Sequence, residues 1–376
     1  KKTIENMTQL NKKKIFFVTG SRAEFGQFEE FLKKLSHQKK WDLSLIITGS
    51  FLESGFENDL DDIIKSKIKI IKKIKLNIKK KNESKNIPAA VSSGIKKFSD
   101  FLSNTKPDYI ILPCDRYELL CPAFAAFFLK IPIIHFYGGE TSAGSFDDTI
   151  RNQVSILSKY HFVSNKKHQN KLINFGIRKK NIFNVGSLSL DGIKNLKFFT
   201  KKKLISLFEN FFDKKTALVT FHPVTNGNTE QEFLNVTNAL EKTKNLNVIF
   251  TGPNNDPENQ IILSKINSLV EKDPKKYFFR RHLGRKLYFS LVKNVDFNLG
   301  NSSSLIYEVP SLKKFSINVG TRQKNRTAGS SVLMIEARST VIFKLIKNKI
   351  HRKNNFHNPY YKKNSIKKII EILKKL

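Results

Sequence analysis

The chain has 376 residues, 39% of them hydrophobic, and is long enough to bury two cores. No apolar run approaches the roughly 20 residues that span a bilayer, and the N-terminal residues lack the apolar stretch of a signal peptide. Cys114 and Cys121 form no CxxC pair, which disfavours a disulfide framework and a thiolate metal site. We therefore expect a soluble, cytoplasmic protein without membrane insertion.

The formal net charge of +36 raises the question of a polyanionic partner. Lysines occur along the whole chain, however, and no aromatic-basic recognition motif accompanies them, so we expect no nucleic acid as a partner. The densest run, KIKIIKKIKLNIKKKNESKN over 67–86, begins with strand-like alternation and ends as a polar loop. An anionic surface remains an alternative partner for this run.

Short β-rich runs alternate with longer amphipathic runs from Lys14 onward, which is typical of βα units around a parallel sheet. The runs of the first half predict strands at 14–20, 43–49, 109–114, 131–139, 160–164 and 182–186. Several are continuously apolar, so we expect central strands covered on both faces. Segments such as AEFGQFEEFLKKL and DDTIRNQVSILSK carry apolar residues at helical spacing.

The pattern then restarts, which predicts a second α/β domain with strands at 216–221, 247–252, 277–283, 295–300 and 314–320. We expect an N-terminal extension over 1–12, a first Rossmann-like domain over 13–190 and a second over 191–376. Ligands bind at the carboxyl ends of the strands in such sheets. We therefore expect an active site in the cleft between the two domains.

The stretch GNSSSLIYEVPSLKKFSINVGTRQ begins at residue 300, where a predicted strand gives way to a predicted helix. Ser302 and Ser303 fall at the helix N-terminus, where free N–H groups favour a phosphate, although serine is also an ordinary N-cap. Glu308, later on this helix, is placed to accept hydrogen bonds from ribose hydroxyls. Arg322 follows the next strand, where a guanidinium can fork onto phosphate. These are the parts of a nucleotide diphosphate site.

A similar element, FFVTGSRAEFGQ, lies near the start of the chain and predicts a strand, a Thr-Gly-Ser turn and a helix beginning near Ala23. Its glycines match neither GxGxxG nor a P-loop, so the pattern gives little support to a dinucleotide site. Arg22 stands at the carboxyl end of a strand beside a helix start. There we favour contact with an anion over a surface arginine without a role.

Acidic residues follow two adjacent predicted strands. Asp115 and Arg116 follow the very apolar ILPC run. Because burying a charge inside the sheet is costly, we expect both side chains at the carboxyl edge of the sheet. Gly138 and Gly139 allow a sharp turn that presents Glu140. Beyond it, Asp147 and Asp148 lead into a helix. Asp115 and one of these two aspartates also fit simple helix caps, but the carboxylates together form a candidate acid/base set for proton transfer on a sugar carbon.

Two histidines have different expected roles. His222 in TFHPVT ends the first strand of the second domain, where an imidazole can bind diphosphate, shuttle a proton or have no special role. His135 lies within IPIIHF, so we expect a hydrogen-bonded core histidine. No histidine pair stands at metal-ligand spacing, and we expect no metal.

These stretches belong to a larger set of motifs: VTGSRAEFG, DRYE, IHFYGGET, FDDTIR, VGSLSLDGI, FHPVT, GNSSSLIYEVPSLK, INVGTRQK and NPYYKKN. With them the chain, from Lys13 onward, resembles the hydrolysing UDP-N-acetylglucosamine 2-epimerases, especially those of bacterial sialic-acid and polysialic-acid capsule pathways. The resemblance implies two Rossmann-like domains in a GT-B arrangement with the active site in the interdomain cleft. It also implies a UDP-sugar substrate, no metal or redox cofactor, and a homodimer or homotetramer.

By this resemblance, the catalytic carboxylates are Asp115, Glu140 and Asp147, with Asp148 beside them. The positions that match contacts to UDP or its diphosphate are Arg22, Arg116, His222, Ser302, Ser303, Glu308 and Arg322. In the reaction of the family, UDP leaves anti to removal of the C2 proton, and water then adds to the resulting 2-acetamidoglucal, releasing N-acetylmannosamine.

Four positions depart from the family pattern: Cys114 replaces a common glycine, Tyr137 a Glu or His, Asn152 a histidine and Ile156 a lysine. They surround the acid/base set and leave the substrate open. A UDP-linked 2,4-diacetamido-trideoxy sugar, as in legionaminic-acid pathways, is the alternative substrate. A GT-B glycosyltransferase and a polyanion-binding protein are the alternative functions.

Overall fold

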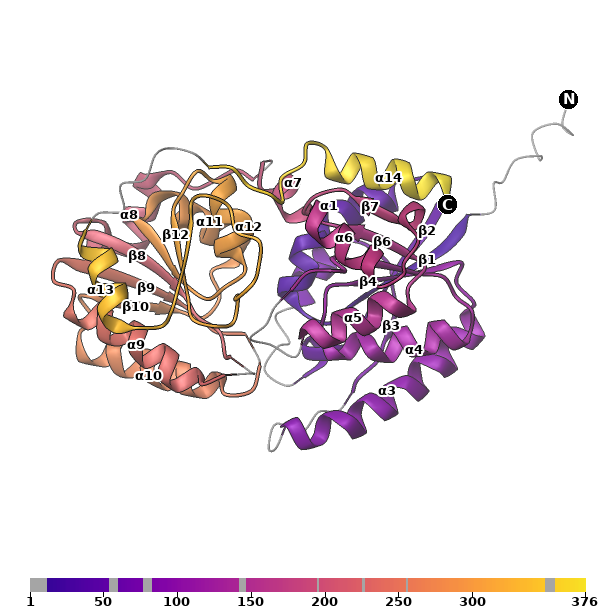
Figure 1. The fold of residues 1–376 in the computed structure, drawn as a ribbon, viewed down its shortest axis with the longest axis horizontal. Coiled ribbons are helices and arrows are strands. Elements are labelled where there is room, and N and C mark those ends of the chain that lie inside the picture. Colours follow the sequence, from indigo (N-terminus) through magenta and orange to yellow (C-terminus); the bar gives the residue numbers. More distant parts are fainter. Residues whose placement is uncertain are drawn as a thin grey trace, which may run out of the picture. The chain divides into compact units, whose positions relative to one another are not determined.

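The protein is described here by a computed structural model, which covers residues 12–53, 60–76, 83–141, 147–194, 196–224, 227–254, 256–348 and 356–376. Within these ranges the chain divides into two compact α/β units. The first comprises the described residues within Lys1–Glu140, Thr149–Leu188 and Lys362–Leu376, and the second comprises those within Thr141–Asp148 and Ser189–Tyr361. Figure 1 colours the chain along its sequence.

Among the described residues, the first unit has a parallel sheet of seven strands in the order β3-β2-β1-β4-β5-β6-β7. The strands are β1 (Lys13–Thr19), β2 (Trp41–Ile47), β3 (Ile70–Lys73), β4 (Tyr109–Pro113), β5 (Ile133–Phe136), β6 (Tyr160–Val163) and β7 (Ile182–Asn184). The helices are α1 (Arg22–Ser36), α2 (Asp61–Ser66), α3 (Glu83–Thr105), α4 (Leu120–Phe128), α5 (Asp147–Leu157), α6 (Lys166–Asn174) and α14 (Ser365–Lys375), and the 3-10 turns are η1 (Gly49–Leu52), η3 (Tyr117–Leu119) and η4 (Lys179–Asn181).

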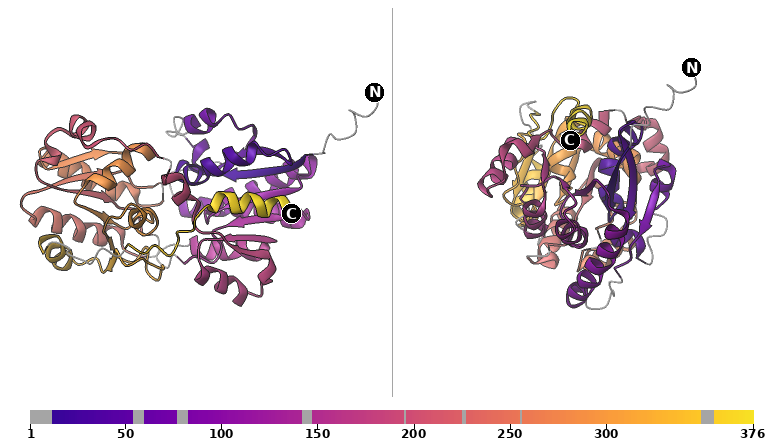
Figure 2. Two further views of the ribbon diagram at one scale, coloured as in Figure 1. Left: turned by 90° about the horizontal axis from the view of Figure 1, so that it is seen from above. Right: turned by 90° about the vertical axis from the view of Figure 1, so that its right-hand side faces the viewer.

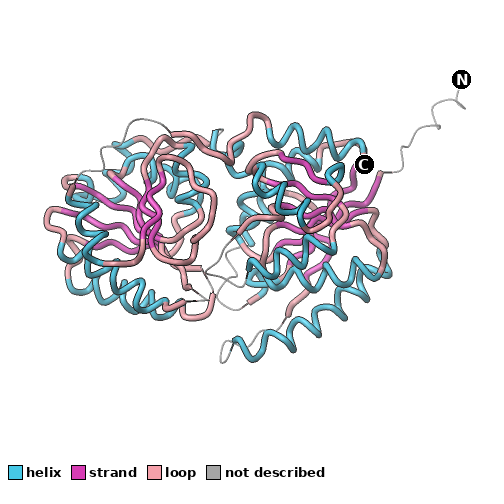
Figure 3. The backbone as a smooth tube through the Cα atoms, in the orientation of Figure 1, coloured by secondary structure: helices cyan, strands magenta, loops and turns pink. Residues whose placement is uncertain are grey.

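Helices cover both faces of this sheet because its central strands are apolar on both sides (Figure 3). On one face, Phe17 of β1 packs against Phe28 of α1, in a cluster that also buries Ile369 of α14. On the other face, Phe16 stacks on Phe101 of α3. The C-terminal helix α14, yellow in Figures 1 and 2, is therefore part of the core of the first unit.

The second unit repeats the architecture with six parallel strands in its described part, ordered β10-β9-β8-β11-β12-β13. The strands are β8 (Lys215–Thr220), β9 (Leu246–Thr251), β10 (Tyr277–Arg280), β11 (Phe297–Gly300), β12 (Ser316–Val319) and β13 (Val332–Ile335). The helices are α7 (Leu188–Lys194), α8 (Lys201–Phe208), α9 (Thr229–Lys242), α10 (Asn259–Lys272), α11 (Gly284–Asn294), α12 (Ser304–Ser311) and α13 (Ser339–Lys347), with the 3-10 turn η5 (Glu209–Phe212). Apolar residues of α9, α10 and α13 cover one face, and those of α8, α11 and α12 cover the other.

Each sheet reverses its strand order at one point. In the first sheet β1 lies between β2 and β4, and in the second β8 lies between β9 and β11. Ligands of doubly wound sheets bind beyond the carboxyl ends of the strands at such a reversal. Arg22 and Asp115 follow β1 and β4, while His222 and Ser302 follow β8 and β11. The topology thus places these predicted site residues where ligands bind in folds of this kind.

The predicted fold class is confirmed, and every predicted strand overlaps an observed one. No strand was predicted at β13, an edge strand with only one buried residue, Val332. In the run 67–86, the strand-like start contains β3, but the polar loop predicted at its end is wrong from Glu83 onward, where α3 begins. That helix is held by an apolar face that includes Phe98 and Leu102. Residues 77–82 of the run lie outside the described residues.

The observed division of the chain differs from the predicted one at its C-terminus. The first unit ends at Leu188, against the predicted residue 190, but 362–376 return to the first unit instead of completing the second. The reason is the apolar side of α14, whose Ile366, Ile369 and Leu373 are buried in the core around α1. Residues 1–11 of the predicted N-terminal extension lie outside the described residues.

A buried carboxyl group fixes the turn between β1 and α1. Ser21 is the N-cap and accepts a hydrogen bond from the Glu24 N–H at 3.3 Å, while Glu24 Oε1 accepts from the Gly20 N–H at 2.9 Å. This reciprocal pattern is close to a capping box. Burial raises the pKa of Glu24 to about 8, against the opposing effect of the Gly20 hydrogen bond. The carboxyl group is therefore mostly neutral at pH 7.

The raised pKa of Glu24 predicts a pH-dependent stability. The contribution of the neutral carboxyl group is fully present below its unfolded pKa of 4.5 and is lost as the pH rises toward its folded pKa of about 8. Glu24→Gln keeps an acceptor for Gly20 and cannot ionise. We expect its free energy of unfolding, relative to wild type, to increase by more than about 1 kcal/mol between about pH 5 and pH 8 in urea titrations. A constant difference would contradict this account, and Glu29→Gln, in a partly exposed ion pair with Lys33, is the control.

Candidate functional site

In the first unit, a buried arginine joins the ends of β4 and β5. Arg151 of α5 is fully buried; its Nη2 forms an ion pair with Asp115 Oδ2, and its Nη1 donates to the Glu140 carbonyl at 2.9 Å. Asp115 itself is partly exposed, and its carboxylate neutralises the guanidinium. Leaving such a cation unpaired in the interior would be costly. The pair therefore fixes Asp115 and Glu140 close together.

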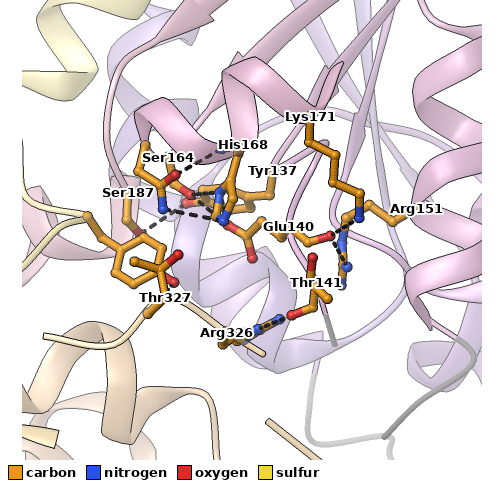
Figure 4. Close-up of polar contacts among 12 residues, drawn as sticks. Tyr137, Glu140, Thr141, Arg151, Ser164, His168, Lys171, Ser187, Arg326 and Thr327 are labelled. Carbon is orange, nitrogen blue, oxygen red and sulfur yellow. Dashed lines mark hydrogen bonds and ion pairs between the residues drawn. The ribbon is translucent and has the colours of Figure 1, made fainter. Parts of the chain in front are cut away.

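Glu140 is held by its backbone and by its carboxylate (Figure 4). Gly139 has a φ of +78°, and a Cβ there would meet the backbone of His168 in α6. Lys171, on the same helix, donates to the Glu140 carbonyl at 3.2 Å. Ser164 Oγ donates to Glu140 Oε1 at 2.7 Å, and the Glu140 side chain is only 6% exposed. The glycine turn predicted from the sequence thus presents a carboxylate that is almost wholly buried.

His135 is the core histidine expected from the sequence. Its ring lies on β5 and contacts Ser155 Oγ at 3.1 Å and the Cys114 carbonyl at 2.9 Å. Burial lowers its pKa to about 4, so the ring is neutral at pH 7. Its hydrogen bond to the Cys114 carbonyl helps to hold the peptide before Asp115 in place.

Asp147 and Asp148 lie in the first turn of α5, where the sequence predicted a helix start. Both side chains are partly buried. Arg151 follows on the same helix and is the residue that contacts Asp115 and the Glu140 backbone. The helix thus connects the two aspartates with the rest of the carboxylate set through its own backbone.

The two arginines predicted to contact an anion in the first unit have carboxylate partners in the structure. Arg22 Nε lies 2.9 Å from Asp62 Oδ2 of α2. Arg116 Nε lies 3.2 Å from both carboxylate oxygens of the buried Glu118 in η3. Both guanidinium groups are therefore oriented by protein contacts, and their anion contact stays a prediction.

In the second unit, one buried asparagine ties the ends of β8 and β11 together. Asn301 Oδ1 accepts from the His222 N–H at 2.7 Å, and its Nδ2 donates to the His222 carbonyl at 2.8 Å. Gly300 precedes it with a φ of +140°, and a Cβ there would clash with the Thr220 carbonyl. The glycine and asparagine of the GNSSS motif thus bring the two strand ends into close contact.

The ring of His222 has a defined tautomer. Nδ1 accepts a hydrogen bond from the Asn254 backbone N–H at 3.0 Å, and because an amide N–H only donates, the ring proton is on Nε2. Burial, with the nearby Arg322, lowers the pKa of His222 to about 3. The imidazole is therefore neutral and can offer Nε2–H as a hydrogen-bond donor.

Arg322 lies close to this histidine. Its Nε donates to the Pro223 carbonyl at 3.1 Å, and its Nη2 is 3.4 Å from Asp256 Oδ2. Only 12% of the Arg322 side chain is exposed. The structure thus brings His222 and Arg322, predicted from separate motifs, to the same end of the second sheet.

The serines of the GNSSS motif lie at the start of α12, as predicted. Ser303 is the N-cap by backbone position but makes no side-chain cap, whereas Ser302 Oγ accepts from the Ser304 N–H at 3.3 Å. Glu308, in the last turns of this helix, is buried, and burial raises its pKa to about 7 against the opposing effects of Ser189 and Arg285. These serines and the glutamate therefore share one helix after β11.

The late NPYYKKN motif supports α12 and the loop after β12. Asn358 Nδ2 donates to the Tyr307 carbonyl at 2.7 Å, and the buried Tyr360 donates from its hydroxyl to the Thr327 carbonyl at 2.6 Å. The rings of Tyr307 and Tyr360 lie 4.0 Å apart, and the Arg326 guanidinium lies over the Tyr307 ring. The motif thus holds the part of the second unit that carries Glu308.

The sequence did not point to several residues that contact the predicted site residues: Arg151, Ser164, His168 and Lys171 in the first unit, and Asn254, Asp256 and Asn301 in the second. A signal existed for one pair, since the SNKKH stretch after β6 places an N-cap asparagine three residues before a histidine. The others are defined only by contacts between distant segments.

The departures from the family pattern have local structural explanations in two cases. Cys114 has a φ of +64°, a left-handed conformation that glycine adopts without strain. Tyr137 also has a φ of +64°, and its hydroxyl accepts from the Leu188 N–H at 3.1 Å. Ile156 is exposed, and Asn152 is partly buried. Nothing in the structure explains the residue types at these last two positions.

The described residues contain neither a cluster suited to a metal ion nor a helix suited to a membrane span. In those ranges, no group of three or more His, Cys, Asp and Glu side chains is arranged to hold a metal ion. In the same ranges, no helix combines the length and the apolar character needed to span a bilayer.

The chain is similar to known proteins over most of its length. The family model described as UDP-N-acetylglucosamine 2-epimerase matches residues 33–374. A Campylobacter jejuni protein named GDP/UDP-N,N'-diacetylbacillosamine 2-epimerase (hydrolyzing) is 34% identical over 327 residues, which cover 86% of this chain and 84% of the relative. Polysialic acid biosynthesis protein P7 of Escherichia coli is 32% identical over 372 residues, which cover 96% of this chain and 94% of that protein.

A solved structure shares the fold at lower sequence identity. UDP-GlcNAc 2-epimerase from Neisseria meningitidis, bound to UDP-GlcNAc, aligns with a TM-score of 0.81 and 21% identity over 96% of this chain and 100% of that chain. This match shows the shared fold of two Rossmann-like domains. By the family match and the identity with its relatives, the chain is a member of the UDP-N-acetylglucosamine 2-epimerase family.

Proposed function

We propose that this protein is a hydrolysing 2-epimerase that converts a UDP-linked 2-acetamido sugar into UDP and the free C2-epimer. The observation that carries the proposal is the Asp115–Arg151–Glu140 arrangement at the ends of β4 and β5. Family membership gives this carboxylate pair its reaction class. In the second unit, His222 and Arg322 supply the donors that a departing diphosphate requires.

The reaction has two steps. First, a carboxylate removes the C2 proton while the C1–O bond breaks and UDP leaves with the bonding electrons, giving a 2-acetamidoglucal. Water then adds its oxygen to C1, and C2 receives a proton on the opposite face. Because a C2 hydrogen is only weakly acidic, the C1–O bond must be largely broken before deprotonation succeeds. Stabilising the departing diphosphate is therefore the main electrostatic task.

Each proposed residue has a role in this scheme. Glu140, Asp115 and Asp147, with Asp148 beside them, exchange protons with the sugar and with water. The neutral His222 donates from Nε2, and Arg322 adds positive charge; Ser302 and Ser303 contribute at the N-terminus of α12. Glu308 accepts from the ribose hydroxyls. Arg22 and Arg116 are proposed as further contacts to the diphosphate.

UDP-N-acetylglucosamine is the proposed substrate, which gives N-acetylmannosamine for sialic-acid-type sugar synthesis in the cytoplasm. A specific observation supports a second candidate, UDP-2,4-diacetamido-2,4,6-trideoxyglucose, because the name of the 34% identical Campylobacter relative states a diacetamido sugar. The name of the Escherichia coli relative, in contrast, places that protein in polysialic acid synthesis.

Incubation with each of the two UDP-sugars, followed by NMR of the products, tests the proposal. We expect free UDP and a free C2-epimer from at least one of them, with deuterium at C2 when the solvent is D2O. Reversible epimerisation with UDP still attached would reject the hydrolysing mode. Consumption that requires an added acceptor would identify a glycosyltransferase, and binding of RNA that excess UDP does not reduce would favour the polyanion alternative.

Glu140→Gln tests the proposed acid/base role. The amide keeps an oxygen acceptor for Ser164 but cannot take a proton, so we expect folding and UDP binding to persist while kcat falls by roughly a thousandfold. Steady-state UDP release measures kcat, and calorimetry measures the affinity for UDP. Glu336→Gln, at an exposed ion pair with Arg338, is the matched control. Normal turnover in Glu140→Gln would exclude this residue from proton transfer.

Arg322→Ala tests the proposed diphosphate contact. Loss of the guanidinium should weaken UDP binding by roughly 10- to 100-fold, because a charge-assisted hydrogen bond is worth about 1.5–3 kcal/mol. Calorimetric titration with UDP measures the change. Arg338→Ala, which removes an exposed arginine of the same unit, should leave the affinity unchanged. Equal affinity in Arg322→Ala and wild type would remove Arg322 from the nucleotide site.

A further inference from the structure

We propose that Ser164 and His168 are positioning residues that orient the carboxylate of Glu140 through a directed chain of hydrogen bonds. This inference rests on the proposed function, in which Glu140 exchanges a proton with the sugar. It adds two residues to the site that no motif of the sequence had singled out. Both come from the segment where β6 ends and α6 begins.

The chain starts at the cap of α6. The N-cap Asn165 accepts the His168 N–H on its Oδ1 at 3.0 Å, and its Nδ2 lies 3.3 Å from His168 Nε2. On the other side of the ring, His168 Nδ1 lies 2.9 Å from Ser164 Oγ, which is 2.7 Å from Glu140 Oε1. Four consecutive polar groups thus connect a helix cap to the carboxylate.

The donors in this chain follow from the cap. Because Oδ1 of Asn165 accepts a backbone N–H, the amide is oriented with Nδ2 toward the ring, and an amide nitrogen only donates. Nε2 of His168 is then the acceptor, and the neutral ring carries its proton on Nδ1. That proton is donated to Ser164 Oγ, whose own proton is donated to Glu140. His168 and Ser164 therefore each accept one proton and donate one along the chain, Glu140 only accepts, and no two protons compete.

The same helix also holds the backbone of Glu140. The His168 carbonyl packs where a Cβ of Gly139 would lie, and Lys171 and Arg151 donate to the Glu140 carbonyl. The backbone contacts fix the peptide, whereas the side-chain torsions of Glu140 must be fixed by contacts to the carboxylate. Ser164 supplies such a contact, and His168 in turn fixes the Ser164 hydroxyl rotor.

The chemical consequence is a carboxylate with a defined reactive edge. A hydroxyl that donates to Oε1 stabilises the ionised form and prevents rotation of the carboxyl group. Polarisation by the ring N–H strengthens that hydrogen bond in a buried setting. Neither Ser164 nor His168 needs to touch the sugar. Their removal should therefore lower kcat more than it changes KM.

The test compares kcat and KM for UDP release from UDP-N-acetylglucosamine and its diacetamido analogue. Ser164→Ala and His168→Leu should each lower kcat by roughly 10- to 100-fold, because small misplacements of a reacting group have effects of this size. KM should stay within about threefold. His168→Asn, whose Nδ2 can take the place of ring Nδ1, and Ser164→Thr, which keeps the hydroxyl, should recover most of the rate. Ser158→Ala, which removes a hydroxyl bonded only to Val154 of the preceding helix α5 in the described contacts, is the control.

The double variant Ser164→Ala with His168→Leu separates positioning from packing. If His168 acts through Ser164, the double variant should be no slower than Ser164→Ala alone. Multiplying losses, an increase in KM with unchanged kcat, or His168→Asn as slow as His168→Leu would overturn the inference. If Glu140→Gln is inactive while both single variants have wild-type rates, this inference fails and the proposed function stands.

A measurement without turnover completes the test. Nitrogen-15 NMR of histidine-labelled protein, with His168 assigned by comparison with the His168→Asn spectrum, reports which ring nitrogen carries the proton. We expect the neutral tautomer protonated on Nδ1 in the free enzyme. Protonation on Nε2 would overturn the directed chain whether or not either UDP-sugar is turned over.

Discussion

The arrangement of the first unit depends on the neutralisation of one buried cation. The Arg151 guanidinium has no exposed surface and satisfies its charge with Asp115 and its hydrogen-bonding capacity in part with the Glu140 carbonyl. An unpaired guanidinium in this position would cost several kcal/mol. The ends of β4 and β5 and the helix α5 are therefore held together by a constraint that hydrophobic packing alone does not supply. The carboxylates of the site are positioned by the same interaction.

In the second unit, a neutral side chain holds the ends of two central strands together. Asn301 pairs with both backbone polar groups of His222, so the ends of β8 and β11 are joined without any buried charge. A neutral partner adds no charge next to His222, whose protonated form is already disfavoured by burial and by Arg322. A neutral ring next to an arginine leaves the positive charge on the arginine and the directed N–H on the histidine. One unit thus carries carboxylates at the ends of its central strands, and the other carries the neutral His222 and an arginine, Arg322, that is paired with Asp256.

The sequence predicted those parts of the fold and the site that depend on local pattern. Apolar runs revealed the strands, and the glycines before Glu140 marked a turn that a Cβ would block. Ser302 and Ser303 were placed correctly because the start of α12 follows from its strand-to-helix pattern. His135 was recognised because an imidazole within an apolar strand must be neutral and hydrogen bonded.

The remaining parts depend on contacts between segments far apart in the chain, which no local pattern contains. Arg151 looked like an ordinary helix residue, because its partner Asp115 lies 36 positions earlier. The return of α14 to the first unit was missed for the same reason, since its apolar side fits either core equally well by pattern alone. The anion contacts predicted for Arg22 and Arg116 took no account of nearby carboxylates. In the structure Asp62 and Glu118 contact these arginines and compete with an anion for them.

The net charge of +36 bears on the electrostatics of the buried carboxyl groups. The chain has more than twice as many basic as acidic residues, and the first unit places Arg151 against Asp115, Arg116 against Glu118 and Lys171 against the Glu140 carbonyl. Such partners would lower the pKa of every carboxyl group if nothing opposed them. Burial opposes them at Glu24, where the carboxyl group bonds a backbone N–H and its pKa is raised. The orientation of each carboxylate in the site therefore has to be fixed by its own contacts. The neutral side chains around Glu140, a serine and a histidine, meet that need because they orient the carboxylate without adding a further charge.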